Sequence, residues 1–128
     1  MEVTKISYKQ PYKEQTPTQI KALFDAIRNN DLEKFSEILP TIDINAQFEQ
    51  RPLSIGLWIE ATNPLVQNGD EFIRQILARK PDLHSVAKML RESLPILIAQ
   101  HKDMCPKDHT TIVRYQLMLD YIEAASEW

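Results

Sequence analysis

The sequence predicts an all-α fold, and three observations lead to this prediction. Apolar residues recur at intervals of three, four and seven positions, which is the spacing of one face of a helix. Capping residues and prolines stand where such stretches begin and end. The chain of 128 residues contains only two glycines, whereas β-hairpins and strand bulges usually call on several. We therefore expect a mostly helical protein without a substantial sheet.

The first predicted helix pair lies near the N-terminus. Thr16 is suited to cap a helix, with Pro17 at the first helical position and Gln19 completing the capping pattern. Asn30 is suited to cap a second helix, which Pro40 ends. The apolar stripes of the two helices are Ile20, Leu23, Phe24 and Ile27, and then Leu32, Phe35, Ile38 and Leu39.

Further helices are predicted along the rest of the chain. Pro52 opens one helical segment, and the sequence Asn68-Gly69-Asp70 begins another. A stretch over residues 86–94 precedes Pro95, which can open a new helix, and Thr110 can cap the final one. About seven helices result. Their predicted core consists of Leu23, Ile27, Phe35, Leu39, Leu53, Leu57, Ile73, Ile76 and Leu77.

Composition and charge narrow the function classes. Hydrophobic residues make up 43% of the chain and charged residues 26%, which is ordinary for a globular domain. Residues 1–15 show no helical periodicity, so we expect an N-terminal arm followed by a single helical domain over residues 16–128. A formal net charge of -3 gives no electrostatic drive to coat nucleic acid or an anionic membrane. We therefore expect neither as a partner.

The predicted location follows from targeting signals and cysteine content. The N-terminus lacks the apolar run of a signal peptide, and no apolar stretch approaches the roughly 20 residues of a membrane span. Cys105 is the only cysteine, so no internal disulfide can form, and a reducing compartment is the simplest expectation. The cytoplasm is therefore the predicted location.

One part of the chain resembles a known structural repeat. Residues 23–33 have the composition of a short helix, a tight turn and the start of a second helix, which runs on to Ile38-Leu39. The sequence Asp43-Ile44-Asn45-Ala46 follows. This order resembles the ankyrin repeat, in which two short helices are followed by Asp-Val-Asn-Ala.

Two later passages extend the resemblance. Pro52-Leu53-Ser54-Ile55 matches the proline and leucine of the ankyrin sequence Thr-Pro-Leu-His, and residues 72–77 are similar to the second helix of the repeat. A third pass runs from Leu94 to Leu119. The resemblance to degenerate ankyrin repeats, over residues 20–124, implies stacked antiparallel helix pairs and a protein-binding role. A compact helical bundle built from the same segments is the structural alternative.

One cluster of side chains invites a chemical interpretation. His101, Cys105 and His109 recur every four residues, and imidazole with thiolate is a ligand set that zinc accepts. A thiolate beside histidine can also act as a nucleophile. However, Pro106 would disturb any helix that placed the three on one face, and no fourth ligand is evident. We expect no metal, no cofactor and no catalysis, with a small enzyme or metal protein centred on this loop as the alternative.

The candidate binding residues lie mainly in the connectors between helix pairs. Phe48 is flanked by charges in the polar segment 47–51, where ankyrin domains carry a protruding finger, and an aromatic residue there can be a binding hot spot. Trp58 could serve either the core or a partner, and burial statistics favour the core. The predicted partner-binding residues are Phe48, Glu49, Arg51, Trp58, Asp82, His84, Tyr8 and Tyr12.

The predicted function is a protein–protein interaction module. An inhibitor, an immunity factor or an adaptor would act by occupying a surface of its partner, and the sequence does not identify that partner. A structural homodimer is a further alternative, because the end helices of a short repeat stack have outer faces that must be capped or buried.

Overall fold

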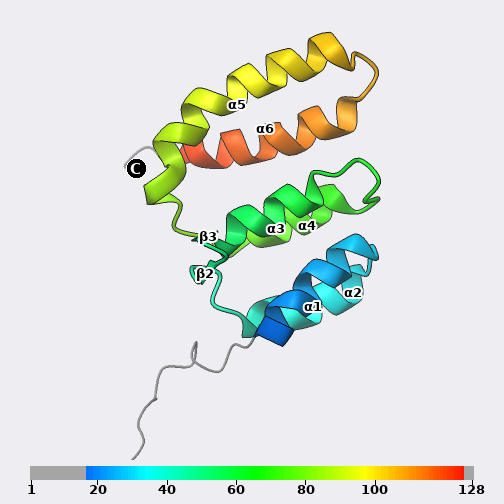
Figure 1. Ribbon diagram of the computed structural model, residues 1–128, viewed down its shortest axis with the longest axis vertical. Coiled ribbons are helices and arrows are strands. Elements are labelled where there is room, and N and C mark those ends of the chain that lie inside the picture. Colours follow the sequence, from blue (N-terminus) through cyan, green and yellow to red (C-terminus); the bar gives the residue numbers. More distant parts are fainter. Residues whose placement is uncertain (1–16, 126–128) are drawn as a thin grey trace, which may run out of the picture.

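The described part of the molecule, residues 17–125 of the computed structural model, is an elongated arrangement of six α-helices (Figure 1). The helices form three successive pairs along the long axis: α1 (Pro17–Arg28) with α2 (Leu32–Ile38), α3 (Leu53–Ala61) with α4 (Gly69–Ala78), and α5 (His84–Met104) with α6 (His109–Ala124). A short 3-10 helix, η2 (Leu39–Thr41), extends α2. The predicted all-α class is confirmed.

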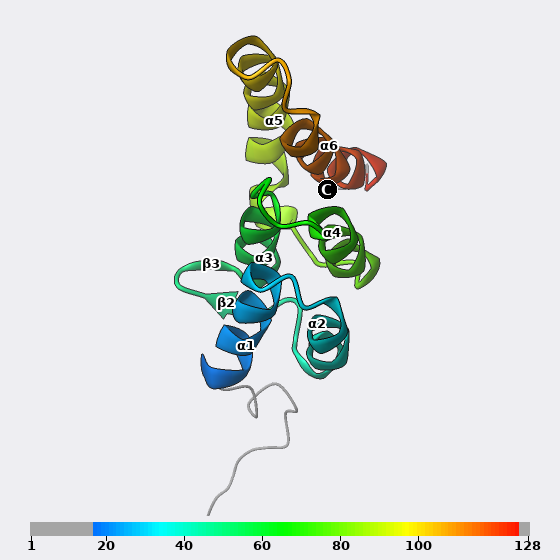
Figure 2. The ribbon, with the colours of Figure 1, turned by 90° about the vertical axis from the view of Figure 1, so that its right-hand side faces the viewer.

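The helices lie in two rows. Figure 2 shows α1, α3 and α5 in one row and α2, α4 and α6 in the other. Within the rows, α1 contacts α3, and α4 contacts both α2 and α6. The first and second pairs share an aromatic core contact, in which the rings of Phe35 and Phe72 meet edge to face with centroids 4.9 Å apart.

The cap of the second helix differs from its prediction. Thr16, the predicted cap of the first helix, lies outside the described residues. The side chain of Asp31 caps α2 by accepting a hydrogen bond from the backbone N–H of Lys34 at 3.1 Å. Asn30 had been predicted for this role, but it adopts a left-handed conformation with φ of 57°. Its side chain instead accepts a hydrogen bond from the backbone N–H of Asn68 at 2.7 Å. This bond links the turn between α1 and α2 to the loop between α3 and α4.

The predicted helix boundary at Pro95 is wrong. The helix α5 is continuous over 21 residues with Pro95 inside it, although proline cannot donate the bond to the carbonyl of Arg91. Leu90, Leu94 and Ile98 are buried on both sides of the proline. Because α5 packs extensively on α6, packing outweighs the roughly 3 kcal/mol that an interior proline costs. The ribbon of α5 bends along its length (Figure 1).

The core follows the predicted stripes with one exception. All of the predicted core residues are buried except Leu77, which is half-buried. It lies at the edge of the α4 stripe and lines an open hollow of about 580 Å³ between the ends of α4 and α6. Leu77 therefore packs against the edge of the core rather than lying within it.

Extended structure is confined to one small hairpin in the described residues. It consists of β2 (Gln47–Phe48) and β3 (Arg51–Pro52), which pair in antiparallel fashion. Figure 2 shows the hairpin projecting from the side of α1 and α3, away from the row of α2 and α4. Within residues 17–125, no helix has the length and apolar character needed to cross a membrane.

Candidate functional site

The hairpin turn has an unusual backbone. Glu49 and Gln50 have φ angles of 52° and 68°, so two consecutive non-glycine residues are left-handed. A two-residue turn of this kind strongly favours Asn-Gly, and a left-handed side-chain residue costs about 1 to 3 kcal/mol. Phe48 pairs with Arg51 across the hairpin, so their side chains lie on the same side. Backbone strain of this kind is typical of segments that hold a functional side chain in place.

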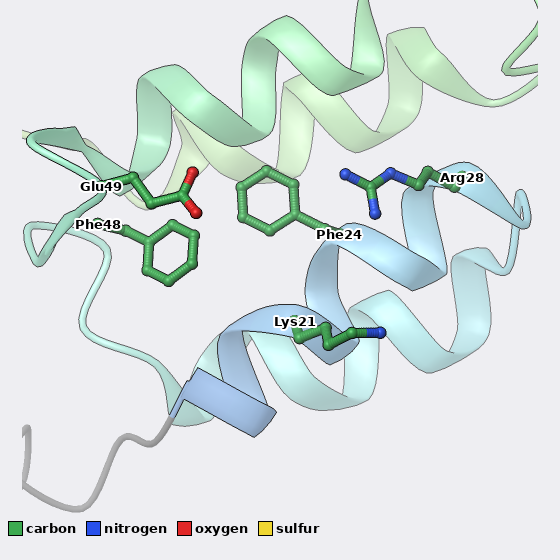
Figure 3. Close-up of a pocket in the computed structure, with 5 residues that line it drawn as sticks. All are labelled: Lys21, Phe24, Arg28, Phe48 and Glu49. Carbon is green, nitrogen blue, oxygen red and sulfur yellow. The ribbon is translucent and has the colours of Figure 1, made fainter.

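The hairpin and two helices enclose a groove (Figure 3). Its main part, about 320 Å³, is lined by Lys21, Phe24, Arg28, Phe48 and Glu49, and we call it the Phe24–Phe48 groove. The two phenylalanines are half-buried, and their ring centroids are 5.8 Å apart. They form an apolar floor with charged side chains around it.

A glycine in α3 allows this arrangement. A Cβ atom added at Gly56 would lie 3.3 Å from the ring atom Cζ of Phe24, so the ring lies directly against the helix backbone. An adjoining hollow of about 180 Å³ extends the groove along α3, past Gly56, to Arg51, Ile59 and Glu60. The groove thus runs between α1, α3 and the hairpin.

The two cations of α1 at the groove are already paired. Lys21 Nζ lies 3.0 Å from Asp25 Oδ2. Arg28 Nη2 lies 3.1 Å from Glu60 Oε1, and Arg28 Nη1 lies 3.6 Å from Asp25 Oδ1. The hydrogen bond and the charge of Glu60 raise the pKa of Arg28 above its ordinary value. The guanidinium carbon of Arg28 also lies 5.8 Å from the ring centroid of Phe24, which is a cation–π distance.

Glu49 differs from these paired groups. Its carboxylate points into the groove between the two phenylalanine rings (Figure 3). It forms no hydrogen bond or ion pair with any other described residue. Arg51, on the other strand of the hairpin, is exposed and lines the adjoining hollow rather than the main groove.

The structure places the predicted binding residues in different surroundings. Phe48, Glu49 and Arg51 come together at the groove. Trp58 is buried, and its Nε1–H donates to the carbonyl of Arg114 at 3.0 Å, so the core interpretation holds and little of its surface is exposed to a partner. Tyr8 and Tyr12 lie outside the described residues.

The second predicted connector faces another hollow. The side chain of Asn45 accepts a bond from the backbone N–H of Asp82 at 2.8 Å, so the two connectors are in contact. Asp82 and His84 are exposed, and Asp82 lines the hollow that also contains Leu77 and Tyr121. A joint role of both connectors in binding remains a prediction.

Sequence reasoning missed most of the groove that lies on the helices. Phe24 was assigned to the buried stripe of its helix, although it lies at the edge of that stripe and is half-buried. The contact between Arg28 and Glu60 joins residues 32 positions apart, so no local pattern could indicate it. The one available signal was Gly56, an isolated glycine inside a helical segment, which often marks a close approach.

The loop between α5 and α6 does not assemble the predicted ligand cluster. His101 Nε2 lies 2.8 Å from Asp108 Oδ2, and Cys105 is exposed. In the part of the chain that the structure describes, no three His, Cys, Asp or Glu side chains converge as metal ligands would. The possible metal cluster of His101, Cys105 and His109 therefore has no geometric support among the described residues.

Asp108 instead has a structural role at the start of α6. Its carboxylate accepts bonds from the backbone N–H of Thr111 at 3.2 Å and from Thr111 Oγ1 at 2.7 Å. The helix cap is thus Asp108 rather than the predicted Thr110. The bond from the Thr111 hydroxyl, followed by that from His101, lowers the pKa of Asp108 to about 2.

Comparison of the chain with models of protein families, with curated proteins and with solved structures finds no match. The geometry and charges of the Phe24–Phe48 groove are therefore the basis on which a function can be proposed.

Proposed function

We propose that the protein is a protein–protein interaction module that binds its partner through the Phe24–Phe48 groove and the hairpin beside it. The observation that carries the proposal is the position and exposure of the Phe48 side chain. Phe48 is a half-exposed aromatic residue, held by a strained turn and placed beside a second aromatic ring. Binding energy in interfaces concentrates in such aromatic and arginine side chains with little ordering cost.

The side chains of the groove suit binding better than catalysis. Its described lining consists of aromatic, aliphatic and charged residues, and no serine, threonine, cysteine or histidine contributes to it. A polar rim around an apolar centre is the usual arrangement of a binding interface. The resemblance of residues 20–124 to ankyrin repeats agrees with this role, because repeat stacks bind partners through exposed connectors.

The mode of action that we propose is surface occlusion, as in an inhibitor, an immunity factor or an adaptor. Occupying a partner's surface needs a rigid anchor and no chemistry of its own. The exposed free thiol of Cys105 fits a reducing compartment, and we propose the cytoplasm.

The test starts by capturing the partner from the native source with the immobilised full chain, followed by mass spectrometry. Titration calorimetry then compares the wild type with Phe48→Ala and Arg51→Ala. We expect each substitution to weaken binding by about 1 to 3 kcal/mol, which is the usual hot-spot range. Leu65→Ala is the matched control, since Leu65 is 87% exposed in the loop between α3 and α4, at the opposite end of the helices from the hairpin. Unchanged affinity of both hairpin variants would remove the groove from the interface.

A second candidate function is a structural homodimer. The end helix α5 exposes four large apolar side chains, which are Met89, Ile96, Leu97 and Met104. A second copy could cover this surface. Light scattering of the purified chain distinguishes a dimer from a monomer, and a monomer at high concentration would eliminate this candidate.

A further inference from the structure

Only some of the charged side chains around the Phe24–Phe48 groove have an ion-pair partner. Lys21 and Arg28 both have carboxylate partners within 3.1 Å, whereas Glu49 has none among the described residues. An incoming anion would meet cations whose charges are already balanced. An incoming cation would meet a carboxylate that no other residue of the described range 17–125 binds.

The aromatic floor of the groove also favours a positively charged ligand. The face of an aromatic ring attracts a cation within about 6 Å of its centroid. Arg28 already uses the ring of Phe24 in this way, at 5.8 Å. The ring of Phe48 borders the groove next to the carboxylate of Glu49 (Figure 3). An aromatic face beside a carboxylate suits a side chain that has both an apolar stem and a cationic end.

The size of the groove limits what it can hold. Small-molecule sites usually measure about 300 to 1,000 Å³ and enclose most of their ligand. The main groove, at about 320 Å³, is at the lower end of this range and is open to solvent between α1 and the hairpin. One long side chain from a partner surface is a better fit than a complete cofactor.

We propose that the Phe24–Phe48 groove accepts an arginine or lysine side chain from an exposed segment of the partner protein. The stem of that side chain packs against the two phenylalanine rings, and its charged end meets the carboxylate of Glu49. The net charge of -3 attracts a basic partner surface over a longer range. The inference rests on the proposed function and adds the chemistry of the partner to it.

The test uses three blocked peptides, Gly-Gly-Xaa-Gly-Gly, in which Xaa is arginine, its neutral analogue citrulline, or glutamate. Each peptide is titrated into the 15N-labelled full chain, and the amide shifts of Phe48, Glu49 and Gly56 are followed. We expect saturable shifts at these three amides with the arginine peptide and much smaller shifts with the other two. The citrulline peptide separates the effect of charge from that of shape.

Two variants locate the binding group. Glu49→Gln keeps the shape of the side chain, and we expect it to raise the Kd of the arginine peptide roughly three- to tenfold, as loss of a charge-assisted hydrogen bond does. Glu71→Gln makes the same charge change at an exposed position on α4, so it should leave the Kd unchanged. Equal effects of the two variants would mean that only net charge matters and would overturn the proposal.

The remaining outcomes distinguish this inference from the proposed function. The inference is overturned if the glutamate peptide shifts the groove amides more than the arginine peptide does, or if the arginine peptide causes no saturable shift. The proposed function survives either result if Phe48→Ala still weakens partner capture. If the arginine peptide binds and depends on Glu49, but Phe48→Ala leaves partner capture unchanged, the groove takes a basic side chain and the proposed function fails.

Discussion

The two glycines of the chain lie at two joints between helix pairs, and the joints are built in different ways. Gly56 belongs to the α1–α3 joint, where the missing side chain leaves room for the ring tip of Phe24. Gly69 belongs to the α4–α6 joint, where an added Cβ would overlap the carbonyl of Ala61 and the guanidinium of Arg114. The first joint is open to solvent at the groove, and the second is closed.

The arginines of the two joints show the same contrast. The side chain of Arg28 is 54% exposed, whereas that of Arg114 is only 4% exposed. Arg114 donates to Asp70 Oδ1 at 2.7 Å and to the carbonyls of Asn63 and Ala61 at 2.8 Å and 3.2 Å. The closed joint is fully packed, as a stabilising contact is, whereas the open joint leaves the groove exposed, where we propose that a partner binds.

Removing the buried arginine should give the largest effect. We expect Arg114→Met to lower the free energy of unfolding by about 3 to 5 kcal/mol, because Asp70 and two backbone carbonyls lose their donor. Arg28→Met is the matched change at the open joint and should cost less than about 1 kcal/mol, since exposed ion pairs contribute little. Urea denaturation measures both values, and similar losses would show that the joints do not differ.

The glycines provide a second test of the contrast. Gly69→Ala forces a side chain into a filled space and should cost about 1 to 3 kcal/mol. Gly56→Ala meets only the tip of Phe24 and gains helix propensity, so its stability should stay within about 1 kcal/mol of the wild type. The same variant should nevertheless weaken binding at the groove, because the ring of Phe24 must move. Thermal melts and peptide titrations of both variants measure these effects, and an intact groove in Gly56→Ala would contradict the account of Phe24.

Phe48 tests how much of the open joint serves stability. The side chain is half-buried against Phe24, so we expect Phe48→Ala to lower the free energy of unfolding by about 1 kcal/mol, well below the cost of removing a core phenylalanine. Arg51→Ala should change it by less than about 0.5 kcal/mol, as exposed substitutions do. Chemical denaturation gives both values. A decrease of several kcal/mol in the free energy of unfolding of Phe48→Ala would show that Phe48 belongs to the core.

The turn inside the third pair gives a further prediction, which depends on pH. The pKa of Asp108 is about 2 in the folded chain and about 3.9 in an unfolded one, so the carboxylate stabilises the fold above pH 4. That contribution is lost as the pH falls from about 4 to about 2. A carboxyl titration by NMR should give the low midpoint, and Thr111→Val should raise it more than His101→Gln does. An Asp108 midpoint near 4 in the wild type would rule out the cap described here.

Sequence periodicity predicted those parts of the molecule that depend on local pattern. The apolar stripes gave the helices and nearly all of the core, and the charged segment with an aromatic residue gave Phe48 and its neighbours at the groove. The break at Pro95 was predicted wrongly because the local cost of proline is visible in the sequence, whereas the packing of α5 on α6 is not.

The contacts at the two joints could not be predicted from the sequence for a similar reason. Arg114 and Asp70 are 44 residues apart, and Arg28 and Glu60 are 32 apart. Charged residues at these positions look like an ordinary solvated surface until the helices are packed. The sequence favours a core position for Trp58, but it does not indicate that its indole N–H donates to the backbone carbonyl of Arg114.

The position of α5 has a consequence for how the molecule opens. Among the described elements, α5 has an extensive contact only with α6, while α3 and α4 each pack against several neighbours. Detaching α5 therefore exposes less apolar surface than unfolding the whole chain. Its amide protons should exchange with solvent through this partial opening, at a free energy below that of global unfolding. The amides of α3 and α4 should exchange last, so protection would decrease from the middle of the molecule towards the α5 end.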